Sequence, residues 1–286
     1  MKLYFKYTSL ALVIIVSVFV ALYAIYAPQS IPTIADTDTA DVTDTADVTD
    51  TSSPDTEETN PPTTEPPTPK KRVALTFDDG PAYDNDDFQR LTYKLVDKLN
   101  EYGGKATFFL VGNRINKTTG QAIAYAAGYG NEIGIHAYTH AYDFSNCDYS
   151  VFISELENTK AKIEYYSDKE VTLFRPPYGA ITGSRAKDSG YPIILWNVDS
   201  EDWVYKSRDD SATAEKNIAA IVENIISQVK DGDIILMHEI YQNSYEAACI
   251  VIDTLTAEGY EFVTVTELIG EENLKIGQIY YSAASR

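Results

Sequence analysis

The sequence predicts an α/β fold, a distorted (β/α) barrel of about seven parallel strands similar to a TIM barrel, preceded by a membrane anchor and a disordered linker. From Lys70 on, apolar runs alternate with amphipathic segments of helical period. This alternation implies parallel strands joined by right-handed crossovers. An open doubly wound sheet is the alternative. No glycine-rich phosphate loop follows the first strand, which argues against nucleotide binding.

Residues 1–27 predict a membrane anchor or a signal peptide. Lys2 and Lys6 precede an uninterrupted apolar run, residues 10–27, whose length lies between a signal-peptide core and a full span. Because no clean A-x-A cleavage site follows, we favour an uncleaved anchor, with secretion after cleavage as the alternative. Either case leaves the lysines inside and predicts an extracytoplasmic location for the rest of the chain.

Residues 28–69 predict a disordered linker. They hold eight of the twelve prolines and no aromatic residue, and the hexapeptide TADVTD occurs twice in succession. Such a composition cannot bury enough apolar surface to fold. Charge repulsion and proline keep the segment extended, which suits a tether between the anchor and the domain that follows.

The net charge limits the possible binding partners, and the cysteine count limits the possible disulfides. A formal net charge of −20 argues against a nucleic-acid partner, because phosphate binding needs clustered Lys and Arg. Cys147 and Cys249 permit one disulfide in an extracytoplasmic protein, and two buried free thiols are the alternative. We expect a monomer.

The predicted folded domain spans residues 70–269, and residues 270–286 form a weakly patterned tail. The candidate strands are residues 73–77, 106–111, 132–136, 171–175, 192–198, 233–238 and 261–265. The candidate helices are residues 87–102, 120–129, 149–166, 184–188, 212–229 and 243–257.

Polar side chains stand at the carboxyl ends of these predicted strands. In a parallel barrel those ends share one rim, where TIM-barrel enzymes carry their chemistry. A solvated turn at the Asp-Asp-Gly-Pro stretch, or a hydrogen-bonded core histidine, explains single cases. One common site explains the whole set: Asp78, Asp79, His136, Arg175, Asp199 and His238.

The residue types in this set predict metal-assisted hydrolysis of an acyl bond. His136 and His140 are four residues apart, a frequent spacing of metal ligands, and imidazole suits zinc. Two histidines and one carboxylate with open positions describe a catalytic rather than a structural zinc site. The second carboxylate can then act as a base, and His238 can donate a proton to a leaving group.

These motifs resemble the five motifs of polysaccharide deacetylases of the NodB type, carbohydrate esterase family four. The resemblance extends over residues 73–269, and the motifs occur in the family's order. They are TFDDG at 76–80, HAYTH at 136–140, RPPYG at 175–179, DSEDW at 199–203 and LMH at 236–238.

The resemblance implies the catalytic roles of four residues. Asp78 would be the general base, and Arg175 would orient it. His238 would be the general acid, and Asp199 would tune it.

The resemblance also implies a metal centre and a loop that differs from the family pattern. Asp79, His136 and His140 would bind a divalent metal, zinc in our expectation, with cobalt, nickel or manganese as alternatives. The family usually has Ser or Thr directly after the first histidine, where this chain has Ala137. That hydroxyl is expected to brace the metal loop, so its absence bears on loop rigidity and metal affinity.

Three further residues would contact the substrate. The backbone N–H of Tyr178 would hold the oxyanion, Trp203 would form a wall of the acetate pocket, and Leu236 would line it. The implied activity is removal of acetyl groups from N-acetylglucosamine in a cell-envelope polysaccharide, peptidoglycan or a chitin-like glycan. An O-acetyl esterase acting on xylan or another acetylated glycan, and a non-catalytic wall-binding protein, are the alternatives.

Overall fold

The computed structural model describes residues 70–82 and 90–285. The predicted anchor, residues 1–27, and the predicted linker, residues 28–69, lie outside the described residues. Among the described residues, no helix has the length and hydropathy to cross a membrane.

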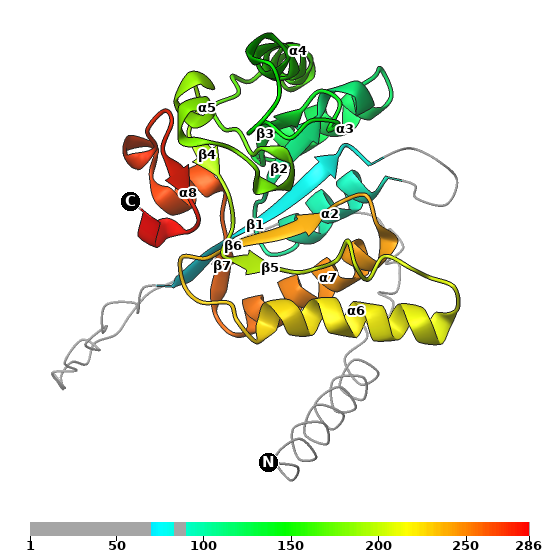
Figure 1. Ribbon diagram of the computed structural model, residues 1–286. Helices are drawn as coiled ribbons and strands as arrows, with labels where there is room; N and C mark the ends of the chain where they lie inside the picture. The colour runs from blue at the N-terminus through cyan, green and yellow to red at the C-terminus, as the bar shows by residue number, and fades with distance from the viewer. Residues whose placement is uncertain (1–69, 83–89, 286) are drawn as a thin grey trace, which may run out of the picture. The chain divides into compact units, whose positions relative to one another are not determined.

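A mostly parallel sheet forms the centre of the described residues, as the sequence predicts (Figure 1). Its hydrogen-bonded order is β3-β2-β1-β6-β5, and β7 pairs with the first residues of β1. Each of these ladders is parallel. The strands are β1 (Lys71–Gly80), β2 (Thr107–Val111), β3 (Glu132–Ala137), β5 (Val198–Asp199), β6 (Ile234–His238) and β7 (Tyr260–Phe262).

Beyond β3 the sheet becomes irregular. Phe174 forms isolated parallel bridges to Ile135 and Ile193, so the predicted strand at 171–175 is reduced to a single bridging residue. The predicted strand at 192–198 is divided into β4 (Ile193–Ile194) and β5. Among the described strands no ladder joins β4 to β5, so closure into a barrel stays a prediction.

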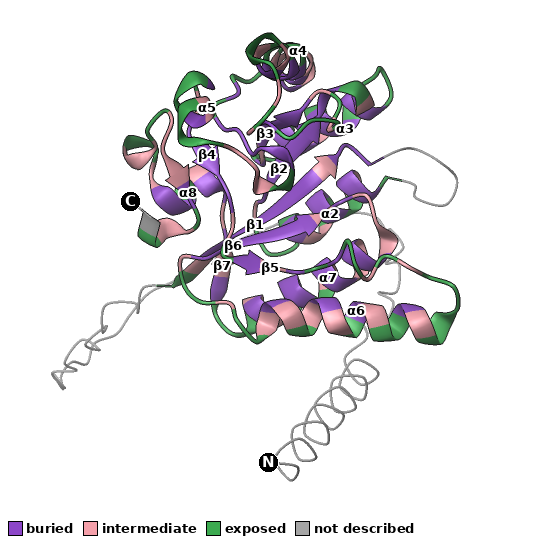
Figure 2. Ribbon diagram, in the orientation of Figure 1, coloured by how far each residue is buried: buried purple, intermediate pink, exposed green. Residues whose placement is uncertain are grey.

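Helices cover the sheet with their apolar sides. Figure 2 shows purple strands and helices whose outward sides are green or pink. In α6, for example, the buried residues are Ala214, Ile218, Ile221 and Ile225, which is the spacing of one helical face. The helices are α2 (Leu91–Asn100), α3 (Thr119–Gly128), α4 (Tyr149–Ser167), α5 (Gly183–Asp188), α6 (Ser211–Ile226), α7 (Gln242–Ala257) and α8 (Val265–Ile269).

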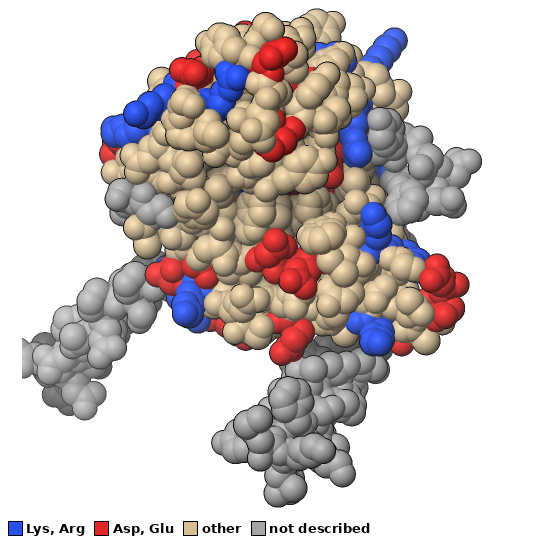
Figure 3. Space-filling model, in the orientation of Figure 1, with Lys and Arg blue, Asp and Glu red and all other residues tan. Residues whose placement is uncertain are grey.

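The core lies between the strands and these helices. Phe77 of β1 and Phe108 of β2 stack with ring centroids 5.3 Å apart. Both rings are fully buried, and burial of such a side chain stabilises the fold by roughly 1.5–3 kcal/mol. The core therefore anchors the part of β1 that directly precedes the Asp78–Asp79 pair. On the molecular face displayed in Figure 3, acidic and basic residues are both scattered over the surface.

Residues after Ile269 contribute to the fold. β8 (Ile279–Tyr280) pairs in parallel with β4. The fully buried Tyr280 donates its hydroxyl hydrogen to the carbonyl of Asn273 at 2.6 Å. A two-residue strand has no periodicity to detect, which is why this segment reads as a weakly patterned tail. Cys147 and Cys249 are both free thiols and partly buried.

Candidate active site

The end of β1 brings the two adjacent aspartates to the site. Asp78 lies in register with His238 of β6. The register between β1 and β2 shifts between Asp78 and Gly80, and Asp79 has a left-handed backbone with φ 70°. An irregularity of this kind re-aims a side chain. It allows both carboxylates to serve one site although successive strand residues normally alternate between faces.

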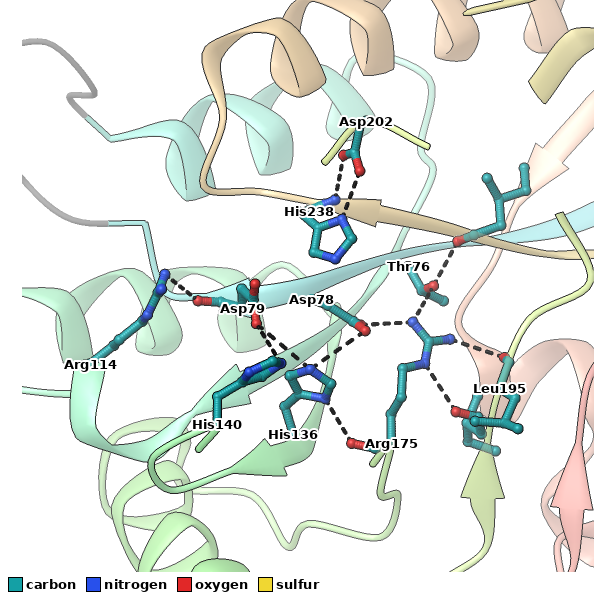
Figure 4. A network of polar contacts seen from close by, with 12 residues as sticks. Thr76, Asp78, Asp79, Arg114, His136, His140, Arg175, Leu195, Asp202 and His238 are labelled. Atoms are coloured by element: carbon teal, nitrogen blue, oxygen red, sulfur yellow. Dashed lines mark hydrogen bonds and ion pairs between the residues drawn. The ribbon is translucent and has the colours of Figure 1, made fainter. Parts of the chain in front are cut away.

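Asp79, His136 and His140 form the metal-ligand cluster that the sequence predicts. Within the described parts of the chain they are the one group of His, Cys, Asp or Glu residues that could hold a metal ion, with ligand atoms within 4.8 Å of one another. Oδ1 of Asp79 lies 3.7 Å from Nε2 of His136 and 3.4 Å from Nε2 of His140 (Figure 4). One ion between these atoms can reach all three residues.

The protonation of His136 suits metal binding. Its Nδ1 lies 2.7 Å from the carbonyl oxygen of Arg175, which can only accept, so Nδ1 carries the hydrogen and Nε2 keeps its lone pair. Burial lowers the pKa of His136, which favours the neutral imidazole that binds metals. A carbonyl acceptor behind a metal-binding histidine is the usual means of orienting the ring.

The groups around Asp79 favour its ionised form. Burial alone would raise the pKa of its carboxyl, but the nearby His136 and His140 lower that pKa below its ordinary value. Arg114, at the end of the helical turn η1 (Gly112–Arg114), donates from Nη1 to the Asp79 carbonyl oxygen at 2.8 Å. Two imidazoles and one carboxylate fit a zinc-like divalent ion with open coordination positions.

Arg175 fixes the other aspartate. Its side chain is 0% exposed, and Nη1 donates to Oδ1 of Asp78 at 2.8 Å and to Oγ1 of Thr76 at 2.7 Å. The remaining nitrogens donate to backbone carbonyl groups, Nε to Ile194 at 3.0 Å and Nη2 to Leu195 at 3.1 Å. The guanidinium is thus held on all sides, and it holds the Asp78 carboxylate in one orientation beside the metal ligands (Figure 4).

The acid partner of His238 is Asp202, and the expectation that Asp199 takes this place is wrong. Nδ1 of His238 lies 2.7 Å from Oδ1 of Asp202, a residue that is 0% exposed. The Asp199 carboxylate instead accepts from Nε1 of Trp196 at 3.2 Å and from the backbone N–H of Glu201 at 2.8 Å. Glu201 has a left-handed backbone with φ 54°, and this turn brings Asp202 back over β6.

Asp202 also determines the charge of His238. Burial alone would lower the pKa of this histidine, but the hydrogen bond and the negative charge of Asp202, followed by the charges of Asp78 and Asp79, raise it to about 9. His238 therefore carries a proton at neutral pH. Because Asp202 occupies Nδ1, the proton on Nε2 is the one available for donation.

The three predicted substrate contacts lie at different depths. Tyr178 is 71% exposed, has φ 61°, and its ring packs edge-on against His140 with centroids 4.8 Å apart. Trp203 is 52% exposed and directly follows Asp202. Leu236 is buried in β6, in register with Thr76 of β1. Their roles around an acyl group stay predictions.

Sequence reasoning missed three residues of the site. Asp202 belongs to the same DSEDW motif as Asp199, and spacing alone does not separate the two. Arg114 follows the predicted strand at 106–111, so the rule that found the other rim residues could have found it. Thr76 accepts from Arg175 and donates to the carbonyl of Ile235 at 2.6 Å, and no sequence signal marks this role.

The chain is similar in sequence to known proteins. The family model for polysaccharide deacetylase matches residues 65–193. The chain is 33% identical over 211 residues to the peptidoglycan-N-acetylglucosamine deacetylase PgdA of Listeria monocytogenes, an alignment that covers 74% of this chain and 41% of that protein. It is 32% identical over 215 residues to a peptidoglycan-N-acetylglucosamine deacetylase of Bacillus cereus, with 72% of this chain and 92% of that protein covered.

A solved structure shows the same similarity. The family 4 acetyl xylan esterase from Clostridium thermocellum, in complex with a cobalt ion, superposes with a TM-score of 0.62 and 34% identity, over 74% of this chain and 98% of that one. The chain spans about two fifths of the length of the Listeria protein, at 41%. With the matched family model, the aligned relatives and the shared fold, this chain belongs to the polysaccharide deacetylase family, carbohydrate esterase family four.

Proposed function

We propose that the protein is a metal-dependent hydrolase that removes acetyl groups from N-acetylglucosamine residues of peptidoglycan and releases acetate. The observation that carries the proposal is the pairing of Asp78 with His238 in register on neighbouring strands, next to the Asp79–His136–His140 cluster. An acyl group bound between them would meet a base, a cation and an acid at once.

The residues divide the reaction between them. A divalent ion at the ligand cluster would polarise the acyl carbonyl and make a nearby water more acidic. Asp78, oriented by Arg175, accepts the proton that the attacking water loses. The backbone N–H of Tyr178 stabilises negative charge on the carbonyl oxygen. His238 gives its Nε2 proton to the departing nitrogen as the carbon–nitrogen bond breaks, which leaves acetate and a free amine.

Location and relatives support peptidoglycan as the substrate. The two curated relatives described above are named for peptidoglycan N-acetylglucosamine deacetylation. The apolar run at residues 10–27, preceded by Lys2 and Lys6, would anchor the chain with its catalytic domain outside the membrane. The acidic, proline-rich residues 28–69 would let a monomeric domain reach the wall. Zinc is the metal that we propose, with cobalt as an alternative that the esterase structure holds.

A second candidate function is O-deacetylation of xylan or another acetylated glycan. The similarity to an acetyl xylan esterase favours it. The same residues suffice, because an ester alkoxide can take the His238 proton in place of an amine nitrogen.

Acetate release by the purified full-length chain in detergent tests both candidates. Peptidoglycan, chitooligosaccharides and acetylxylan are offered in parallel, with and without a chelator. We expect release from peptidoglycan that chelation stops and zinc restores. Preferential release from acetylxylan would favour the esterase function, and absence of both bound metal and acetate release would leave a non-catalytic wall-binding protein.

A further inference from the structure

We propose that Glu155 is a positioning residue that holds His140 in its metal-binding conformation. Glu155 belongs to α4, an element that supplies none of the ligands. The inference rests on the metal site of the proposed function. It explains how that site is kept in shape in a chain whose metal loop carries Ala137 between its ligands.

The Glu155 carboxylate contacts the loop between the two histidines at three points. Its Oε2 accepts from the backbone N–H of Tyr138 at 2.8 Å and of Thr139 at 2.7 Å. Its Oε1 accepts from Oγ1 of Thr139 at 2.9 Å. Glu155 is 5% exposed, so these bonds are made away from water. A buried carboxylate with three donors constrains the groups that it binds.

His140 needs such a constraint, whereas His136 does not. His136 lies within β3 and is fixed by the ladder and by its bond to the Arg175 carbonyl. His140 lies beyond the end of β3, and its backbone is left-handed with φ 58°. A residue with a β-carbon keeps this conformation only where its surroundings impose it.

Thr139 links Glu155 by hydrogen bonds to the residue that follows His140. Its hydroxyl donates to Glu155 and accepts from the backbone N–H of Ala141 at 3.3 Å. The residues on both sides of His140 are therefore tied to one carboxylate. Loss of that carboxylate would free the loop and the His140 ring, while the other two ligands would stay in place.

Helix α4 also braces the Asp79 side of the metal site. Nζ of Lys162 donates to the carbonyl oxygens of Gly112 and Ile115, each at 3.0 Å, on either side of Arg114. Arg114 in turn holds the Asp79 carbonyl. One helix thus supports both ligands that have a left-handed backbone, Asp79 and His140, and Glu155 is its direct contact with the histidine loop.

Metal affinity of the full-length chain tests the proposal, because it is measured without any substrate. In Glu155→Gln the side chain keeps its size, but it loses the negative charge that strengthens the hydrogen bonds from the loop, and one acceptor oxygen becomes an NH₂ group that can only donate. We expect the zinc Kd, measured by competition with a chromophoric chelator, to rise by about 10- to 100-fold. We also expect the visible spectrum of the cobalt-loaded variant to change, because the His140 ring is no longer held in one orientation.

Glu132→Gln is the matched control. Glu132 starts the same strand β3 and also accepts from two threonine hydroxyls and one backbone N–H, those of Thr107 and Thr266. It lies at the opposite end of β3 from the metal ligands, so its replacement should lower Tm and leave the zinc Kd unchanged. An equal loss of zinc affinity in both variants would overturn the proposal, as would an unchanged Kd in Glu155→Gln.

If Glu155→Gln does not fold, a second pair of variants tests the same proposal. Thr139→Val removes the hydroxyl, and Thr139→Ser keeps it. We expect weaker zinc binding in the valine variant and near-normal binding in the serine variant. Wild-type affinity in Thr139→Val would overturn the proposal. A wild-type chain that binds no zinc would refute the proposed metal site itself, which separates the two failures.

Discussion

The Asp202 carboxylate contacts His238 twice, at Nδ1 of the ring and at the backbone N–H, each at 2.7 Å. The first contact favours the charged imidazolium, and the second keeps the carboxylate in line with the ring. His238 is therefore both protonated and oriented before a substrate binds (Figure 4). This pairing makes the pH dependence of the reaction predictable.

Asp202→Asn should move the alkaline limb of the pH–rate profile to lower pH. His238 acts in its protonated form, so activity is present below its pKa and is lost as the pH rises through it. With Asp202 present that pKa is raised to about 9, and without the Asp202 carboxylate only the charges of Asp78 and Asp79 oppose the effect of burial, which lowers the pKa. The measurement is kcat/KM for acetate release across pH. Asp199→Asn is the control and should leave the alkaline limb at its wild-type pH. If the alkaline limb moves only in Asp199→Asn, Asp199 rather than Asp202 is the residue that raises the pKa of His238.

Asp78→Asn should stop acetate release without releasing the metal. The side chain keeps its shape and its contact with Arg175, but it no longer accepts a proton, and loss of a general base costs about 10²- to 10⁴-fold in rate. Acetate release and zinc content are measured on the same preparation. Undiminished release would remove Asp78 from the role of base.

Zinc should stabilise the folded chain, and His140→Ala should abolish this effect. A ligand that binds only the native state adds about 2.7 kcal/mol when its concentration is 100 times its Kd. We therefore expect Tm to rise with zinc in the wild-type chain and to fall after chelation. Thermal unfolding followed by circular dichroism measures both. A zinc-dependent Tm shift of full size in His140→Ala would place the ion elsewhere.

Arg175→Met should destabilise the fold by about 3–5 kcal/mol, because it leaves the buried Asp78 carboxylate without its cationic partner. The free energy of unfolding in urea measures this change. Lys70→Met is the control, since Lys70 forms an exposed ion pair with Glu261 at 2.6 Å and such pairs contribute about 0–1 kcal/mol. Similar losses of unfolding free energy in the two variants would mean that the buried Arg175–Asp78 pair contributes no more to stability than an exposed pair.

Much of the fold follows from local patterns in the sequence. The apolar runs at 73–77, 106–111 and 233–238 became β1, β2 and β6, since strand-length apolar runs bounded by turns are buried strands in parallel sheets. The helical periods at 149–166 and 243–257 became α4 and α7 within one or two residues. The runs at 171–175 and 192–198 failed to form full strands, because their pairing depends on distant segments such as β8.

The sequence by itself determined that Asp78, Asp79, His136 and His238 lie at strand ends and share one edge of the sheet, because parallel strands send their carboxyl ends to the same edge. Only the tertiary structure decided which neighbour each residue meets. Asp202 rather than Asp199 reaches His238 because the chain reverses at Glu201, and Glu155 reaches the histidine loop because α4 packs against β3. Strand position is a local property of the chain, whereas these contacts depend on loop paths and helix packing that no local pattern encodes.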